Sequence, residues 1–195
     1  RLRSGLGDDA EALALLDRQH ELLQPLGADA PTSLLLDAAA LRGHSLRLLG
    51  RERECLDTLG TLLPTAQAAA DAAPLPVAEF YSQLGRCHAG LDAPAAAREL
   101  FSQALQLRRT YTSASASVAE SENDLALLAP PEQRLAALRR ALAHLRASGG
   151  EQNALGVEIW RNLGDAYAGQ QDALEAEAAY RQSLEIALAR FGANH

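Results

Sequence analysis

The five histidines are the residues best suited to acid, base or metal-ligand chemistry, and they are scattered along the chain: His20, His44, His88, His144 and His195. None of them belongs to an H-E-x-x-H pair, and the two cysteines do not form a C-x-x-C motif. Ser45 follows His44, but neighbouring residues of a helix point in different directions, so the pair does not indicate a nucleophile beside its base. The sequence therefore predicts no catalytic residue, no metal site and no cofactor.

All 18 basic residues are arginines, which excludes a phosphate-binding loop that ends in lysine. The net charge of −7 disfavours nucleic acid and anionic membrane surfaces as partners. No apolar run is long enough to cross a bilayer, and no signal peptide is evident. Cys55 and Cys87 are interpreted as two reduced packing thiols in preference to a disulfide, which fits a cytoplasmic protein.

Alanine and leucine dominate the apolar residues, aromatic residues make up only 4% of the chain, and this mixture favours helices over strands. Apolar residues recur three and four apart between Pro and Gly breakers, as on one face of a helix. Pro64 should bend the third segment, and Asp29 is a plausible N-cap of the second. The expected helices cover about 8–23, 29–49, 52–73, 77–90, 93–111, 118–128, 132–147, 155–168 and 173–191.

Internal self-similarity is the strongest signal in the sequence. One copy has the spacing W-x2-L-G-x2-Y followed by A-x3-aromatic, in Trp160, Leu163, Gly164, Tyr167, Ala176 and Tyr180. An earlier copy has the same frame in Tyr81, Leu84, Gly85, His88, Ala97 and Phe101. This frame resembles the tetratricopeptide repeat almost position for position. The stretch "ALARFGANH" at 187–195 is similar to the joint of kinesin-light-chain-type repeats.

Gly43 and Gly85 lie 42 residues apart, close to the period of that repeat type. Approximate repeats are expected over 36–73, 78–111, 118–148 and 157–190, with a helix in 1–30 before the first. The chain begins at Arg1 and not at Met, so we expect a single repeat domain from a larger protein. Its enrichment in Arg, Ala, Gly and Leu resembles that of proteins from GC-rich bacteria.

The resemblance implies an all-α fold, a right-handed superhelix of antiparallel helix pairs. Gly85 and Gly164 should face the partner helix of their own pair, where any side chain would push the two backbones apart. Tyr81, Phe101, Trp160 and Tyr180 should fill the wider space between adjacent pairs.

In such an array the first helix of each pair lines an inner groove, and its polar residues are the candidate peptide-binding site: Gln83, Arg86, Asn123, Asp124, Arg161, Asn162 and Asp165. Asn162 resembles the peptide-clamping Asn of the family, and Arg supplies a preference for acidic residues. The alternative interpretation is an ordinary solvated helix face. The basic segment with Arg134, Arg139, Arg140 and Arg146 is interpreted as a solvated face paired with acids, with an acidic-partner site as the alternative.

The function predicted from these observations is a scaffold module that binds a protein or peptide within a larger bacterial signalling protein. The alternative is an assembly scaffold that self-associates into a homo-oligomer through open repeat ends, where an apolar face would be left uncovered. An enzyme is the least favoured interpretation.

Overall fold

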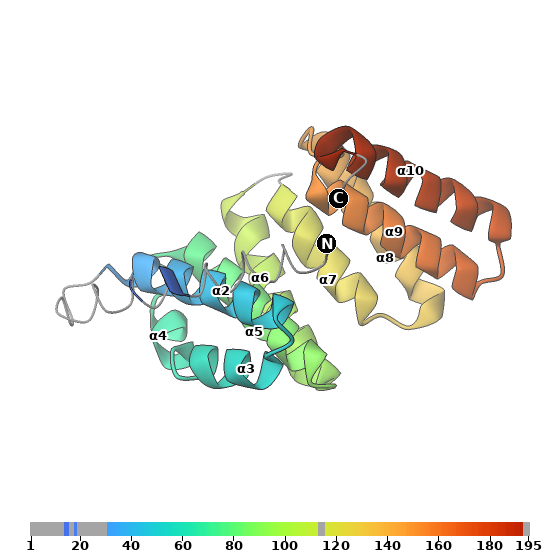
Figure 1. The fold of residues 1–195 in the computed structure, drawn as a ribbon. Coiled ribbons are helices and arrows are strands. Elements are labelled where there is room, and N and C mark those ends of the chain that lie inside the picture. The colour runs from blue at the N-terminus through green and yellow to red at the C-terminus, as the bar shows by residue number, and fades with distance from the viewer. Residues whose placement is uncertain (1–13, 16–17, 19–30, 113–115, 193–195) are drawn as a thin grey trace. The chain divides into compact units, whose positions relative to one another are not determined.

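The computed structural model describes residues 14–15, 18, 31–112 and 116–192, and every regular element in these ranges is an α-helix (Figure 1). The predicted all-α fold is therefore confirmed for the described residues. The chain divides into two compact units, Arg1–Leu107 and Arg108–His195. The predicted helix over 8–23 falls almost entirely outside the described residues, as does Asp29.

The first unit is built on α2 (Thr32–Leu48), which packs against both α3 (Glu52–Gly60) and α5 (Pro74–Gly90). Its core contains Leu36, Leu46 and Leu59, all fully buried, together with Val77 and Phe80. The short α4 (Leu63–Ala68) leads from α3 to α5, and α6 (Pro94–Tyr111) follows α5 and extends past Leu107.

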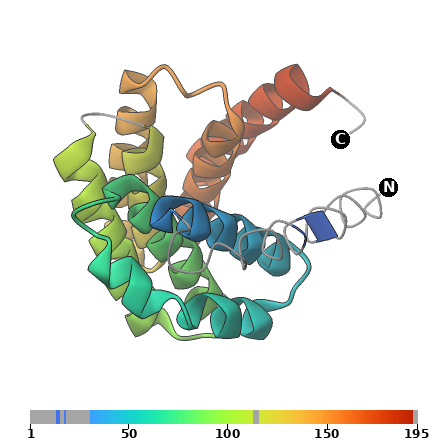
Figure 2. The ribbon, with the colours of Figure 1, turned by 90° about the vertical axis from the view of Figure 1, so that its left-hand side faces the viewer.

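Proline positions set where these helices begin. The chain breaks between α3 and α4 at residues 61–62, and Pro64 lies in the first turn of α4, so the predicted bend is confirmed (Figure 2). Pro74 and Pro76 open α5 in the same way, where the missing N–H costs no helical hydrogen bond. The residue that caps α2 is Pro31, with no side-chain hydrogen bond at this end.

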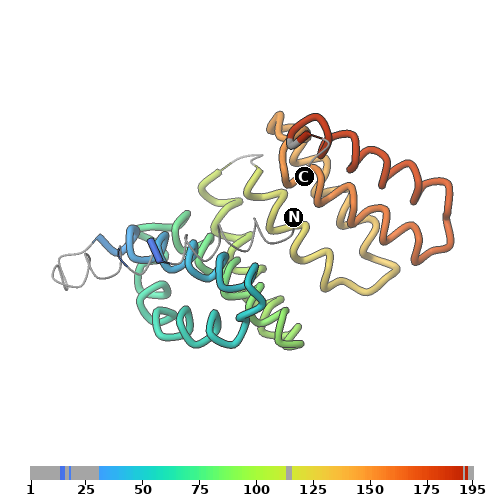
Figure 3. The backbone as a smooth tube through the Cα atoms, viewed as in Figure 1, coloured from blue at the N-terminus to red at the C-terminus, as the bar shows by residue number. Residues whose placement is uncertain are grey.

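The second unit contains α7 (Ala116–Leu127), α8 (Pro131–Ala147), α9 (Ala154–Gly169) and α10 (Ala173–Phe191). Each of these helices packs along the next, and the loops 128–130, 148–153 and 170–172 are too short for any other arrangement (Figure 3). The buried side chains of α8 and α9 form one apolar cluster that includes Leu138, Leu142, Ile159 and Leu163.

Left-handed backbone follows the first helix of three pairs, those that begin with α2, α5 and α9. Gly50, Asp92 and Gln171 have φ values of 70°, 57° and 63°, and they are separated by the same 42 and 79 residues as Gly43, Gly85 and Gly164. The amide of Ala93 bonds to the carbonyl of His88 at 3.0 Å, and the amide of Asp172 bonds to that of Tyr167 at the same distance. The repeat seen in side chains is therefore present in the turns as well.

The two frame glycines mark close contacts inside helix pairs, as predicted. A Cβ on Gly85 would lie 2.6 Å from Cε1 of Phe101, and a Cβ on Gly164 would lie 2.4 Å from Cε1 of Tyr180. The rings of Phe101 and Tyr180 thus cover the glycine of their own pair, which corrects their predicted place between adjacent pairs. A small residue at these positions makes room for a ring and not only for a backbone.

The two cysteines contradict the prediction of separate reduced thiols. α3 packs against α5, and the structure joins Cys55 to Cys87 in a disulfide between Cα atoms 6.0 Å apart. Both residues are fully buried. The two cysteines are 32 residues apart in the sequence, which did not indicate that they are in contact. A disulfide between them gives no support for a reducing compartment.

Candidate functional site

Three charged residues of α9 share one face of that helix, because they are spaced three and four residues apart: Glu158, Arg161 and Asp165. Arg161 and Asp165 are exposed and Glu158 is half-buried. We call these three residues the α9 polar face. It carries both signs of charge on a rigid helix, which suits recognition of a polar polypeptide segment.

A chain of side-chain hydrogen bonds runs behind this face and joins α9 to α7. Asn162 donates from Nδ2 to Oδ1 of Asn123 at 2.9 Å, and Asn123 donates from Nδ2 to Oε1 of Glu158 at 3.0 Å. The guanidinium of Arg161 donates to Oδ1 of Asn162 at 3.3 Å. Asn123 is 0% exposed and Asn162 only 3%. The two amides therefore bond to each other and to the residues of the α9 polar face, and they fix its position relative to α7.

Asp165 is held from the other side by α10. The hydroxyl of Tyr180 donates to Oδ1 of Asp165 at 2.7 Å, and this hydrogen bond to the carboxylate raises the pKa of Tyr180 above its ordinary value. The carboxylates at both ends of the α9 polar face are thus hydrogen-bonded by residues of neighbouring helices. Arg161 lies between them with an exposed side chain.

The structure brings together four of the seven candidate residues: Asn123, Arg161, Asn162 and Asp165. Asp124 lies on α7 and is buried, with 4% of its surface exposed. Gln83 and Arg86 lie on α5 of the first unit, where Gln83 is buried and donates to Glu79 at 2.8 Å. Four of the candidate side chains are therefore buried and are not the exposed groove residues that the sequence indicated: Gln83, Asn123, Asp124 and Asn162.

Glu158 was not among the predicted residues, although its position three residues before Arg161 could have placed it on the same helix face. The arginines on α8 were predicted to form a solvated face paired with acids, and their stacking on aromatic rings was not predicted. Arg139 stacks over the ring of Tyr167 at 5.5 Å, and Arg146 stacks over Trp160 at 5.4 Å. Arg146 also pairs with Glu151 at 2.8 Å, which lowers the pKa of that carboxyl. These two arginines join α8 to α9, so they are not simply solvated.

A second group of charges joins the end of α6 to α7. Arg108 is 2% exposed and donates to the hydroxyl of Ser121 at 2.7 Å. Arg109 pairs with the buried carboxylate of Glu122 at 2.6 Å, and Nε2 of His144 lies 3.6 Å from the same carboxylate. The ion pair with Arg109 compensates the buried charge of Glu122, and these contacts hold the helices together.

Neither a metal site nor a membrane span is found in the described part of the chain. Among the described residues, no three or more His, Cys, Asp or Glu side chains are grouped so that they could hold a metal ion. No helix within the described ranges has the length and apolar character required to cross a membrane.

Known families and structures show what the chain is similar to. The family model described as tetratricopeptide repeat matches residues 157–189, which include most of α9 and α10. This match lies where the frame of Trp160, Gly164 and Tyr180 is most complete. No curated protein matches the sequence.

Solved structures resemble the whole chain. BtubC (BKLC) from P. vanneervenii is 18% identical with a TM-score of 0.69, and the match covers 100% of this chain and 77% of that one. A putative kinesin light chain with nearly identical TPR-like repeats, from Podosopora anserina, is 16% identical with a TM-score of 0.63 and covers 97% and 93%. MamA is 16% identical with a TM-score of 0.54 and covers 96% and 94%. At these identities the likeness is one of fold, and the fold is all-α and tetratricopeptide-like.

Proposed function

We propose that this chain is a protein- or peptide-binding module, that its ligand lies against the α9 polar face, and that it performs no chemistry of its own. Tetratricopeptide-like folds generally mediate protein–protein interactions as non-enzymatic scaffolds. The main support for this site is the hydrogen bond between Asn162 and Asn123. These two buried amides also bond to Arg161 and Glu158 and hold both residues in position.

Recognition would rest on Arg161. A guanidinium offers planar pairs of N–H donors that match a carboxylate, so an acidic side chain of the ligand is the natural partner. Glu158 and Asp165 flank it, and each already accepts a hydrogen bond from the protein. They would favour a basic or amide group on either side of that acidic residue. The expected ligand is therefore a polar segment with an acid at its centre.

The biological setting is also part of the proposal. Composition and the repeat type suggest a module of a larger bacterial signalling protein, with repeats over 36–73, 78–111, 118–148 and 157–190. The net charge of −7 argues against nucleic acid as the partner.

The test uses a display library of random peptides selected on the intact chain, followed by calorimetric titration of the most enriched peptide. Arg161→Ala should weaken binding by about tenfold or more, because a charge-assisted hydrogen bond is lost. Arg140→Ala is the matched control, since Arg140 is an exposed arginine on α8 outside the α9 polar face, and it should bind as the wild type does. Equal affinity of Arg161→Ala and wild type, or no enrichment over an unrelated protein, would rule out this site.

A further inference from the structure

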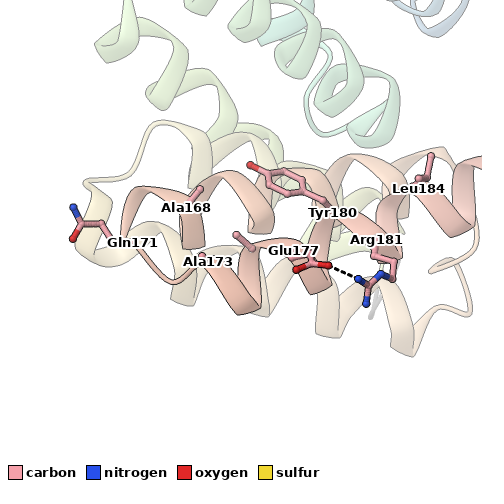
Figure 4. A pocket seen from close by; sticks show the side chains of 8 residues that line it. Ala168, Gln171, Ala173, Glu177, Tyr180, Arg181 and Leu184 are labelled. Carbon is pink, nitrogen blue, oxygen red and sulfur yellow. Dashed lines mark hydrogen bonds and ion pairs between the residues drawn. The ribbon is translucent and has the colours of Figure 1, made fainter.

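A hollow of about 600 Å³ lies beside α10, on the part of the second unit that no other described helix of that unit covers (Figure 4). Its lining comes from the end of α9, the turn and α10: Ala168, Gln171, Ala173, Ala176, Glu177, Tyr180, Arg181 and Leu184. We call it the α10 groove. Its floor is apolar, and Glu177 and Arg181 form an ion pair along one edge (Figure 4).

Large apolar side chains of α10 are exposed along this groove. Tyr180 is 39% exposed and Leu184 is 57% exposed, and Leu188 continues the line one turn further at 46%. Their spacing of four residues places all three on one stripe of the helix. A stripe of this kind on a water-facing helix indicates a surface made to be covered.

The same unit shows what covers such a surface. In the repeat frame Leu142 of α8 has the position that Tyr180 has in α10, yet Leu142 is only 5% exposed. The difference is that α9 packs on α8, where Leu142 belongs to one cluster with Ile159 and Leu163. The first helix of a following pair is thus the natural occupant of the groove beside a second helix.

The chain itself exposes a first helix with the required pattern. On α2, Leu34, Leu41 and Leu48 are 39%, 58% and 48% exposed, and their spacing of seven residues forms a seam suited to packing against another helix. The opposite side of α2 is buried against α3 and α5. We call these three leucines the α2 seam.

We propose that the α2 seam of one copy of this chain docks in the α10 groove of a second copy. Exposed Asp37 lies between two leucines of the seam, and Arg181 lies along the groove, so an acidic group of one surface can pair with a basic group of the other. Because the two surfaces differ, association is head-to-tail, and it either closes into a ring or continues as a chain. This inference involves neither Arg161 nor any ligand of the α9 polar face.

The test measures the molar mass of the full chain by sedimentation over a series of concentrations. The molar mass of the wild type should rise with concentration to that of a dimer or a larger assembly. Leu41→Arg removes the centre of the seam and Leu184→Arg blocks the groove, and each alone should lower the association constant by about tenfold or more. Leu75→Arg is the control, because Leu75 is 43% exposed on α5 and belongs to neither surface. Circular dichroism establishes that all three variants keep their helices.

Mixing the two blocked variants gives the sharpest readout. Leu41→Arg retains a groove and Leu184→Arg retains a seam, so an equimolar mixture should form a one-to-one dimer and nothing larger. A wild type that stays monomeric at every concentration overturns the proposal. So does assembly that Leu41→Arg leaves unchanged, which would instead indicate that two α10 helices pair with each other.

Discussion

Asn162 of α9 and Asn123 of α7 are 39 residues apart in the sequence, and their side-chain amides are joined by a hydrogen bond of 2.9 Å. This contact connects the first helices of two successive pairs directly, without help from the second helix between them. Asn162 also accepts a hydrogen bond from Arg161, and Asn123 donates one to Glu158. The geometry of the α9 polar face therefore depends on a buried polar contact and not on apolar packing alone.

Replacing Asn162 with alanine should destabilise the second unit by about 1–3 kcal/mol, because Oδ1 of Asn123 loses its buried donor. Trp160 is the only tryptophan and lies on α9, so its fluorescence during urea unfolding reports on this unit. The double variant Asn123→Ala and Asn162→Ala should cost less than the sum of the single variants. Strict additivity would show that the two amides are not coupled.

Three glycine positions should respond differently to alanine. Gly85→Ala should destabilise by about 1–3 kcal/mol, because its Cβ meets the buried ring of Phe101. Gly164→Ala should cost less, since Tyr180 is 39% exposed and its ring has room to move. Gly60→Ala is the control: beyond its chain neighbours and the backbone of its own helix, no atom lies within 4 Å of an added Cβ, and a gain of up to about 1 kcal/mol is expected. Thermal unfolding monitored by circular dichroism measures the change in stability of each variant. A larger loss for Gly164→Ala than for Gly85→Ala would contradict this packing of a ring on each glycine.

A glycine at residue 171, in the turn before α10, should stabilise the fold. Gln171 has a φ of 63°, a region that costs a residue with a side chain about 1–2 kcal/mol. Gln171→Gly should therefore stabilise by about 0.5 kcal/mol after the entropy cost of glycine is counted. At its neighbour Gln170, φ is −92°, so Gln170→Gly should destabilise. A melting temperature that falls in both variants would show that the backbone of Gln171 is not strained.

Stability should also depend on pH through Glu151. Its hydrogen bonds from Arg146 lower the pKa of the Glu151 carboxyl in the folded chain, so the ionised carboxylate stabilises the fold above the ordinary value of 4.5. That contribution is lost as the pH falls through the lowered pKa. Glu151→Gln should cost about 0.5–1 kcal/mol at pH 7, and the difference from wild type should shrink below about pH 4.5. Glu185→Gln, at an exposed position of α10, is the matched control substitution.

Local features of the structure followed from local sequence. The last helix was expected over 173–191 and is Ala173–Phe191, because a turn residue and the helix-forming run after it act over a few residues. The glycine contacts of Gly85 and Gly164 followed from spacing in the same way. The tetratricopeptide frame was readable because the helices of one pair are neighbours in sequence.

Contacts between pairs did not follow, and they decide the candidate site. No pattern in the sequence indicates that Asn162 meets Asn123, that Cys55 meets Cys87, or that Arg146 stacks on Trp160. The rotation of one helix against another decides whether a polar residue at the edge of a face is exposed or buried. For that reason the expected clamp residue Asn162 is a buried support, and its neighbour Arg161 is the exposed group.

We expect the α9 polar face to select its ligand by charge, and parallel peptide selections on wild type and on Arg161→Glu measure this selection. The enriched peptides are sequenced, and the excess of Asp and Glu over the starting library is compared. Wild type should enrich acidic residues at one position, and Arg161→Glu should enrich Arg or Lys there. The same acidic preference in both selections would contradict the account, because the charge of residue 161 would then play no part in binding.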